Sequence, residues 1–476
     1  MQQNRTSTTT LPEPFLSIIP LKYIVLVIVV LVAFLVHFDL SAVTIALPTI
    51  GSDFHMDAVS LSWVSTAYLL ATVVFLVPFG KLADICGRRR VFFAGIGLFT
   101  CVSFLLFFVF SAPLLVLLRA VQGIGSAMIF ATSTAILISV CDEDERGRML
   151  GIYITAVYLG LSTGPFLGGV LTQFAGWKYI FLINVPIGIT ALLLLNARLD
   201  REWKECAGEP FDLSGAVIYG LTLVLGVVGL SLLPAVFGFV LLALGLCGAA
   251  AFFFVEKRTT KPVFDLTLLT SHRIFALSSL TSLVCYSATF AVAFLMSLDL
   301  QFTQGFTPVQ AGLVLLVQPL MQALVSPFTG RLSDRIEPRT VVSFGMGLVA
   351  TGLFLLIFVS DTTPLWYIVA ALALLGTGFG FFASPNENAI MSSVEQRYYG
   401  VAAGTLSTMR LMGQVFSMAI ATMVFAIVIG STEVTAASAG AFLVCFHILF
   451  SLFTLLCIAG IIVSLNRGNL RATGAE

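Results

Sequence analysis

The composition of the 476-residue chain excludes a water-soluble globule, because 58% of its residues are hydrophobic, 10% are charged and the mean hydropathy is +1.04. The 24 basic and 24 acidic side chains give a formal net charge of zero, so we expect no nucleic-acid partner. The eight cysteines lie singly and the four histidines are scattered, so we expect no disulfide framework, no metal site and no cofactor. The composition predicts an integral membrane protein.

Apolar stretches long enough to cross a bilayer follow one another along the whole sequence. A helix needs about 20 residues to cross a hydrocarbon core of about 30 Å, and about fourteen stretches of that length can be marked off. They are 22–48, 59–79, 91–110, 113–138, 149–173, 178–197, 213–232, 235–255, 274–299, 308–329, 341–360, 365–391, 400–429 and 438–464. This predicts an all-α fold with fourteen transmembrane helices. The first stretch is long enough to span, so we expect it to remain in the mature protein.

Basic residues are concentrated in alternate loops. One set of loops contains Lys81, Arg88, Arg89, Arg90, Arg146, Arg148, Arg198, Arg201, Lys204, Lys257, Arg258, Lys261, Arg273, Arg331, Arg335, Arg339 and Arg397, with Arg467 and Arg471 in the tail. The other set contains only Lys178. By the positive-inside rule the first set is cytoplasmic. We therefore expect a multi-pass protein of the plasma membrane with both termini in the cytoplasm.

A repeated charged motif divides the chain. The segment GKLADICGRRR, Gly80–Arg90, follows the second span, and GRLSDRIEPRT, Gly330–Thr340, follows the tenth with the same opening pattern of glycine, base, leucine, small residue and aspartate. This predicts two parallel six-helix repeats, within 1–198 and 273–476, and an inserted two-helix hairpin within 199–272.

Four motifs in chain order resemble one family of transporters. LSAVTIALP resembles the first-helix motif of fourteen-helix drug:proton antiporters, and GKLADICGRRR resembles the signature loop after helix 2 of the major facilitator superfamily. LLRAVQGIGSA resembles that superfamily's fourth-helix motif, and GLSTGPFLGG resembles the fifth-helix motif of its proton-coupled exporters. The resemblance covers essentially the whole chain. It implies the major facilitator fold and an exporter of multidrug or quaternary-ammonium type, which we expect to be a monomer surrounded by lipid.

The repeated motif is suited to gating between two states. We expect Gly80 and Gly330 to permit close backbone approach, and Asp84 and Asp334 to pair with a neighbouring base or cap a helix. Arg88 is expected to face the cytosol and lipid phosphate. The alternative for the arginines of this motif is simple anchoring at the membrane surface.

Small residues recur along the fifth span. Gly160, Gly164 and Gly168 are four positions apart and form one smooth stripe on which another helix can pack closely, and Gly169 extends it. Pro165 removes a backbone donor and can bend the helix. We expect tight packing here to block leakage; the alternative is the general small-residue packing of membrane helices.

Few charged residues lie well inside the predicted spans, where an ionised side chain costs about 2.5 to 3.5 kcal/mol on insertion scales. We expect Asp39 to meet Arg119, and Glu387 to form a second pair with Arg410. A carboxylate that is paired in one state and dehydrated in another changes its proton affinity, so we interpret Asp39 or Glu387 as the carrier of a coupling proton. The alternative for each pair is a static salt bridge.

Other polar residues interrupt the later spans. Asn386, Glu387 and Asn388 in PNENAIMSS break an apolar run, and such groups are tolerated toward the bundle interior or a cavity, so they are candidates for the substrate path. Asp299 lies near the outer end of the ninth span, where we expect it to be solvated at the interface.

The function that these features favour is proton-coupled export of amphipathic drugs, cationic ones included, by alternating access. Because arginines can neutralise both acids, the charge of the cargo stays open. The alternative is a dedicated exporter of an endogenous metabolite, siderophore or lipid. An enzyme is not expected, because neither a nucleophile with an oriented base nor clustered metal ligands can be identified, and the absence of GxxxxGK[ST] argues against an ATP-driven pump.

Overall fold

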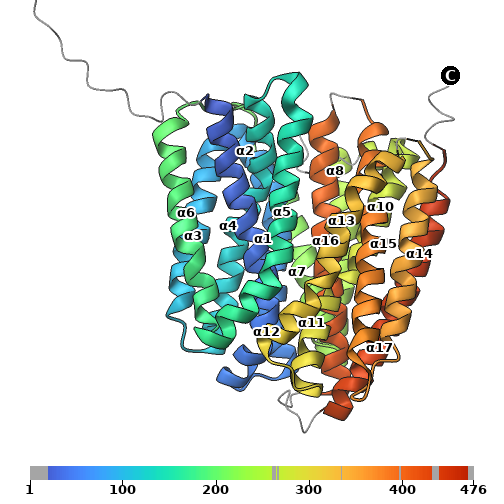
Figure 1. Cartoon of the computed structure of the whole chain (residues 1–476). Helices are drawn as coiled ribbons and strands as arrows, with labels where there is room; N and C mark the ends of the chain where they lie inside the picture. The colour runs from blue at the N-terminus through green and yellow to red at the C-terminus, as the bar shows by residue number, and fades with distance from the viewer. Residues whose placement is uncertain are drawn as a thin grey trace, which may run out of the picture.

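The computed structural model describes residues 20–259, 264, 267–333, 335–395, 398–430 and 439–469. Within them, fourteen helical spans are long and apolar enough to cross a membrane (Figure 1), which confirms the predicted all-α membrane fold. The helices are α1 (Leu21–Phe54), α2 (Ala58–Cys86), α3 (Arg88–Phe107), α4 (Ala112–Val140), α5 (Arg146–Phe174), α6 (Lys178–Arg198), α7 (Leu213–Ser231), α8 (Val236–Arg258), α9 (Thr267–Ser271), α10 (Arg273–Thr289), α11 (Ala291–Leu298), η3 (Asp299–Thr303), α12 (Pro308–Leu315), α13 (Val317–Ser333), α14 (Pro338–Leu356), α15 (Leu365–Ser392), α16 (Tyr399–Val428) and α17 (Ala439–Leu465).

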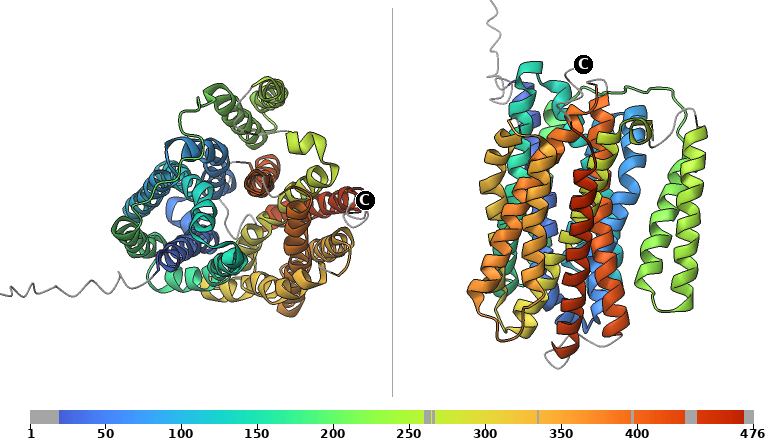
Figure 2. Two further views of the ribbon diagram at one scale, coloured as in Figure 1. Left: turned by 90° about the horizontal axis from the view of Figure 1, so that it is seen from above. Right: turned by 90° about the vertical axis from the view of Figure 1, so that its right-hand side faces the viewer.

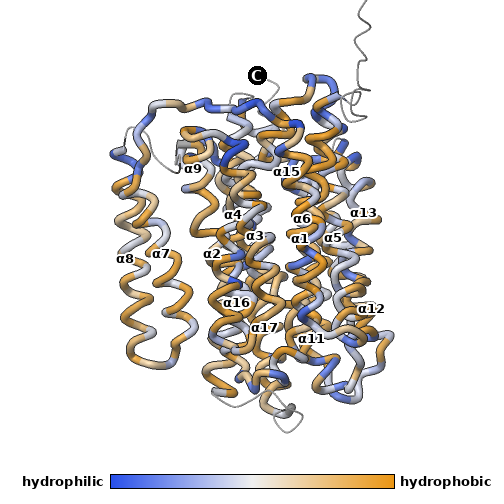
Figure 3. The backbone as a smooth tube through the Cα atoms, turned by 90° about the vertical axis from the view of Figure 1, so that its left-hand side faces the viewer, coloured by the Kyte–Doolittle hydropathy of each residue, from blue (hydrophilic) through white to orange (hydrophobic). Residues whose placement is uncertain are grey.

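Two bundles and a separate hairpin make up the molecule. Helices α1–α6 form the first bundle and α10–α17 the second, while α7 and α8 lie as a pair at the margin (Figure 2). Hydrophilic residues gather at the two ends of the helices and hydrophobic residues lie between them (Figure 3), as a bilayer-spanning protein requires. The two six-helix repeats and the inserted hairpin are confirmed.

Glycines bring the two helices of the hairpin together. A Cβ atom at Gly229 would lie 2.8 Å from the Leu242 nitrogen, and one at Gly238 would lie 2.9 Å from the Gly229 carbonyl oxygen. Such close packing is a common source of helix association in lipid. On the other side, α7 contacts the first bundle, because the Tyr219 hydroxyl donates to the Val73 carbonyl at 3.1 Å.

The bundles join at the end of the molecule opposite to the start of α1 and the end of α17. We call this end the far side and the other the terminus side. In Figure 1, α11 and α12 lie against α1 and α5 at the far side. Hydrogen bonds that join the bundles there are Ser62–Thr422 (2.7 Å between hydroxyl oxygens), Ser297 to the Thr44 carbonyl (2.9 Å), Gln301 to the Ile45 carbonyl (3.1 Å) and the Val309 N–H to Gln173 (3.3 Å).

The second span is longer than its apolar stretch. α2 continues to Cys86, so Gly80 and Asp84 lie on the last turns of a helix, and the expectation of a loop at these residues was wrong. The chain turns at Gly87, whose φ of 124° favours glycine, and α3 begins at the next residue. Hydropathy marks the apolar part of a span but not the polar turns that extend a helix beyond it.

Candidate functional site

Asp39 and Arg119 form an ion pair inside the first bundle. Arg119 Nη1 donates to Asp39 Oδ2 at 2.6 Å, and both side chains are 0% exposed. The guanidinium also lies 4.3 Å from the centre of the Tyr68 ring, a cation–π contact. The structure therefore brings together the two charges that the sequence singled out, and it removes both from water.

Uncharged polar side chains complete this cluster. Asn184 donates to Asp39 Oδ1 at 2.8 Å, and Gln122 accepts from Arg119 at 2.6 Å while donating to Ser103 at 3.0 Å. Sequence reasoning missed these partners. Two signals in the sequence could have indicated them. Gln122 lies one helical turn after Arg119, and Asn184 interrupts an apolar span. Hydrogen bonds from uncharged side chains therefore hold this ion pair in place in addition to its own charges.

Glu387 of α15 and Arg410 of α16 form the second ion pair, between Glu387 Oε1 and Arg410 Nη2. In contrast to the first pair, these side chains are 35% and 33% exposed. The Arg410 guanidinium lies 5.3 Å from the centre of the Tyr286 ring, and it interacts electrostatically with His37 of α1 and Tyr153 of α5. The pair thus lies on the second bundle, faces the first, and is accessible to solvent.

Asn386 does not face a substrate path in this structure. The residue is 1% exposed. The side-chain amide nitrogen donates to Ser282 at 2.8 Å, and the side-chain oxygen Oδ1 accepts from Arg467 at 2.9 Å. Its neighbour Asn388 is half-buried at the terminus side and donates to Ser333 at 3.2 Å. Of the three candidates for the path, only Glu387 combines a charge with exposure between the bundles.

Arg467 follows the last apolar span in the sequence, yet the structure buries its side chain. It is 1% exposed and donates to Ser278 at 3.2 Å as well as to Asn386. Burial lowers the pKa of its guanidinium to about 10, which leaves it charged at neutral pH. The side chain reaches back from the end of α17 into the space between α10 and α15, which no single stretch of sequence can reveal.

The glycine stripe of α5 packs on α1. A Cβ at Gly160 would lie 2.7 Å from the Phe34 carbonyl oxygen, and one at Gly168 would lie 2.8 Å from the Ala42 Cα. Gly164 faces Ser41, whose hydroxyl donates to the Gly160 carbonyl at 3.2 Å. The close helix packing expected of this stripe is present, and only glycine permits it at this separation.

The other edge of the same motif packs on the second bundle. Gly169 lies against the backbone of Pro308, and Gly312 of α12 lies against the backbone of Pro165. Because the two glycines face the partner helix reciprocally, α5 and α12 approach closely at the far side. The motif thus contributes to the junction between the bundles as well as to the interior of one.

The charged motif at the end of α2 is covered by the linker, residues 199–212. Arg88 bonds to Asp84 at 2.8 Å and to Glu205 at 2.7 Å, and Lys81 bonds to Glu209 at 2.8 Å. Arg88 was expected to face cytosol and lipid phosphate, but its side chain is only 12% exposed, so this expectation was wrong. The acids of the linker lie next to these bases in space, although more than a hundred residues separate them in sequence.

The glycines of the two charged motifs differ from expectation. Within the described part of the chain, no atom outside its own helix would lie within 4 Å of a Cβ at Gly80, so the close approach expected there is wrong for this state. At Gly330 a Cβ would lie 3.1 Å from the Ser384 hydroxyl, a tight but side-chain contact. Asp334 lies outside the described residues.

Asp299 was expected to be solvated, and this expectation was wrong. The residue is 0% exposed, in the π-helical turn η3 at the far side. Leu300 beside it is likewise buried, and the η3 turn packs against α11 and α12.

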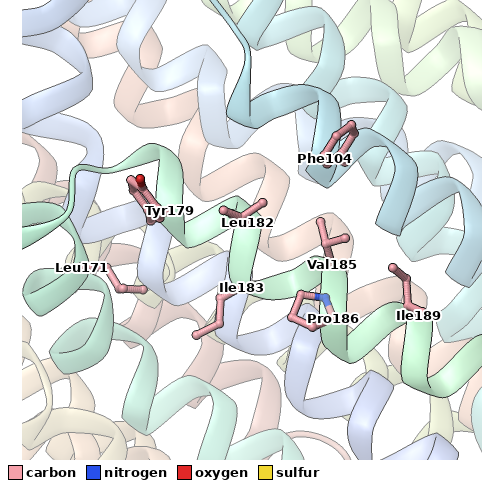
Figure 4. A pocket seen from close by; sticks show the side chains of 8 residues that line it. All are labelled: Phe104, Leu171, Tyr179, Leu182, Ile183, Val185, Pro186 and Ile189. Atoms are coloured by element: carbon pink, nitrogen blue, oxygen red, sulfur yellow. The ribbon is translucent and has the colours of Figure 1, made fainter.

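Two surface grooves lie in the apolar region, and no member of either ion pair lines them. The larger has a volume of about 450 Å³ and opens between α3, α5 and α6 (Figure 4). Its lining residues are Phe104, Leu171, Tyr179, Leu182, Ile183, Val185, Pro186 and Ile189. A second, of about 190 Å³, lies between the hairpin and α16. With no charged side chain in the larger groove, it provides no site for proton exchange.

Comparison with known proteins places the chain among transporters. The model of the Major Facilitator Superfamily matches residues 29–281 and 277–465. The riboflavin transporter RibZ of Clostridioides difficile is 30% identical over 82% of this chain and 85% of its own length. The multidrug resistance protein Stp of Mycobacterium tuberculosis is 31% identical over 81% of this chain and 73% of its own, and the cephamycin export protein CmcT of Amycolatopsis lactamdurans is 32% identical over 81% and 82%. Since the family model matches both bundles in a protein with fourteen membrane spans, this chain is a multi-pass membrane transporter that belongs to the Major Facilitator Superfamily.

Proposed function

We propose that this transporter is a proton-coupled antiporter that exports amphipathic compounds, cationic ones included, across the plasma membrane. The terminus side is cytoplasmic in this proposal, because the basic loops lie there. Residues 1–198 and 273–476 are the two moving bodies, and 199–272 provides the linker and the hairpin. The molecule works as a monomer whose ligands are the small-molecule substrate and protons.

The observation that carries the proposal is the partly exposed ion pair on the second bundle, which faces the first. Glu387 and Arg410 lie where a substrate entering between the bundles meets them, and they are accessible while the bundles are joined at the far side. A proton on Glu387 removes its charge and frees Arg410, whereas a cationic substrate competes with Arg410 for the ionised carboxylate. Proton and cargo are thus alternatives at one carboxylate, which is the basis of exchange.

Asp39 takes a second role in the same proposal. In this state it is paired, fully buried and held by Arg119 and Asn184. A proton can reach it only when the first bundle rearranges and admits water. Proton exchange at Asp39 therefore belongs to another step of the cycle than exchange at Glu387.

The structural motifs support alternating access. The far side is closed by α5 packing on α12, and the open surface at Gly80 on α2 is available for contact when the terminus side closes. Asp84 and Arg88 stiffen the end of α2, and Gly330 occupies the matching place in the second bundle. The glycine stripe of α5 excludes water from the closed end.

A second candidate function is export of one endogenous metabolite. The relative named as a riboflavin transporter favours this alternative, because its identity to this chain, 30%, is close to the 31% of the multidrug resistance protein. Siderophores and lipids belong to the same class of cargo. Flux measurements with a mixed compound library separate a narrow from a broad substrate range.

The test is substrate flux in proteoliposomes with an imposed pH gradient. We expect the pH gradient to drive export of amphipathic dyes. Glu387→Gln and Asp39→Asn should remove the dependence of dye flux on the pH gradient, while dye flux down its own concentration gradient persists. The matched control is Asp361→Asn, an exposed carboxylate in the loop after α14. If flux in either acid variant kept the pH dependence of the unmodified protein, that residue would not be a coupling acid.

A further inference from the structure

A buried carboxyl at the far side has no role in the proposed exchange. Asp299 Oδ2 accepts a hydrogen bond from the Gln304 side chain at 3.1 Å. Among the residues that the structure describes, Asp299 has no cationic partner and Oδ1 accepts no hydrogen bond. An ionised carboxylate at 0% exposure with one donor is unfavourable, whereas the neutral acid carries an O–H that can donate.

The backbone at Asp299 is also unusual. The Gln304 N–H donates to the Asp299 carbonyl at 3.0 Å, which makes the turn π-helical. Turns of this kind are rare and are often found at functional sites. The Thr303 hydroxyl lies close to the carboxyl on the next turn. It carries its own hydrogen and can donate to the carboxyl in either protonation state, so it supplies no counter-charge.

The turn that carries Asp299 also fastens the two bundles together. Ser297 donates to the Thr44 carbonyl at 2.9 Å, and Gln301 donates to the Ile45 carbonyl at 3.1 Å. Both bonds must break for the far side to open. Ser297 and Gln301 each lie two residues from Asp299, so the buried acid and the contacts that close the molecule share one short segment.

No cationic side chain of the described helices forms an ion pair with Asp299. On α1, the titratable groups toward the far side are Asp53, which accepts from the Trp177 indole, and His55 at the end of the helix. α10 contributes Cys285 and Tyr286, about 20 Å earlier along the chain at about 1.5 Å per residue. α12 and the far half of α16 contain no titratable side chain.

We propose that Asp299 takes up a proton from the outer aqueous phase before the far side closes, and that closure requires this proton. This inference rests on the proposed function for the orientation and for alternating access. Water or hydronium outside transfers the proton to the carboxylate, and the same proton returns outside when the far side reopens. No proton crosses the membrane through Asp299, so it is a positioning residue of the outer gate and not a coupling acid. Acid outside then favours closure, and alkaline conditions favour opening.

The test is hydrogen–deuterium exchange of the full chain in lipid nanodiscs, without substrate, at acidic and at alkaline pH. Variants are compared at the same pH so that the intrinsic exchange rate cancels. In the unmodified protein we expect the far half of α1 and the 299–312 segment to be more protected at acidic pH. Asp299→Asn should lose this dependence and stay protected at both, while Asp361→Asn should retain it.

Retention of the full pH dependence in folded Asp299→Asn would overturn the proposal. If that variant does not fold, Gln304→Leu provides the second measurement. It removes the hydrogen bond to the Asp299 carboxyl, and this removal favours the protonated acid, so protection should extend to higher pH. An unshifted pH profile in Gln304→Leu would equally overturn the proposal. Asp299→Glu, which keeps a titratable group, should keep the dependence. Hydrogen–deuterium exchange needs neither substrate nor a pH gradient. A failure of the proposed proton-coupled transport can therefore be distinguished from a failure of the proposed role of Asp299.

Discussion

Asp39 illustrates how a membrane protein accommodates a buried charge. Its carboxylate is neutralised by Arg119 and further bonded by Asn184, and the guanidinium is covered by the Tyr68 ring. Removal of one member of such a pair leaves the other charged and unsolvated, which is more costly than removal of both. The two residues therefore depend on each other for stability, whatever their role in transport.

We predict that Arg119→Met lowers the stability of the folded protein by about 3 to 5 kcal/mol, the cost of leaving a buried partner charge uncompensated. The double variant with Asp39→Asn should recover most of this loss. Thermal unfolding of the purified protein in detergent measures both. Arg258→Met, at an exposed position on α8, serves as the control and should unfold as the unmodified protein does. Equal losses in the single and double variants would contradict mutual dependence.

At the residue scale, the sequence predicted the charged members of the sites but not their surroundings. Asp39, Arg119, Glu387 and Arg410 stand out because they interrupt apolar runs. Arg467 does not, because it follows the end of an apolar run and resembles an ordinary interfacial base. Its burial depends on where α10 and α15 end in space, which is a tertiary property.

Among the helices, α5 packs closely against two others through different faces. One face carries the glycine stripe against α1, and the other presents Gly169 and Pro165 to α12. The spacing of four residues was sufficient to predict the first face. The second face was not predictable, since it depends on the arrangement of two bundles that are distant in sequence.

We predict that Gly168→Ala destabilises the protein and slows transport, because the new methyl group would lie 2.8 Å from the Ala42 Cα and 2.9 Å from its carbonyl oxygen. Gly151→Ala is the matched control on the same helix, where a Cβ meets nothing within 4 Å. Alanine favours a helix over glycine by about 0.5 to 1 kcal/mol, so the control should be neutral or stabilised. Thermal unfolding and dye flux compare the two, and equal behaviour would contradict the packing argument.

The linker shows why a charged motif cannot be interpreted from its own residues alone. The bases at the junction of α2 and α3 resembled membrane anchors in the sequence, yet Lys81 and Arg88 bond to linker acids. The backbone joins in as well, because the Arg88 N–H donates to the Trp203 carbonyl at 3.1 Å and the Cys206 N–H to the Asp84 carbonyl at 3.0 Å.

We predict that Lys81→Glu loosens the linker, since it replaces an ion pair with a repulsion against Glu209. A partly exposed pair contributes up to about 1 kcal/mol, so cleavage of the linker in limited proteolysis should accelerate by roughly fivefold. The exchanged pair, Lys81→Glu with Glu209→Lys, should restore the original rate. A double variant that is cleaved as fast as the single one would show that the pair does not hold the linker.

At the scale of the whole molecule, the number of spans, their order and the parallel repeat were predictable, because a bilayer imposes a fixed length and apolar composition on each helix. Which end of the molecule is closed was not predictable. That property depends on contacts such as Ser62 with Thr422, two ordinary hydroxyl residues without any sequence signal.

We predict that cysteines at these two positions lock the transporter. The hydroxyl oxygens of Ser62 and Thr422 are 2.7 Å apart, so Ser62→Cys with Thr422→Cys should form a disulfide under oxidation. Oxidation should abolish flux and a reductant should restore it, since the far side must open once per cycle. Each single variant is the control. Undiminished flux in the fully oxidised double variant would show that the two bundles do not separate at this point.

The hairpin is in contact with both bundles at once. Tyr219 of α7 is bonded to α2, while the groove beside it is bordered by Met409 and Met412 of α16. When the two bundles rotate relative to each other, the hairpin cannot keep fixed contacts with both of them. One of the two contacts of α7 must therefore change during the cycle. We expect α7 to stay with α2, to which it is hydrogen-bonded, and to shift against α16, where flexible methionines and a groove allow side chains to repack.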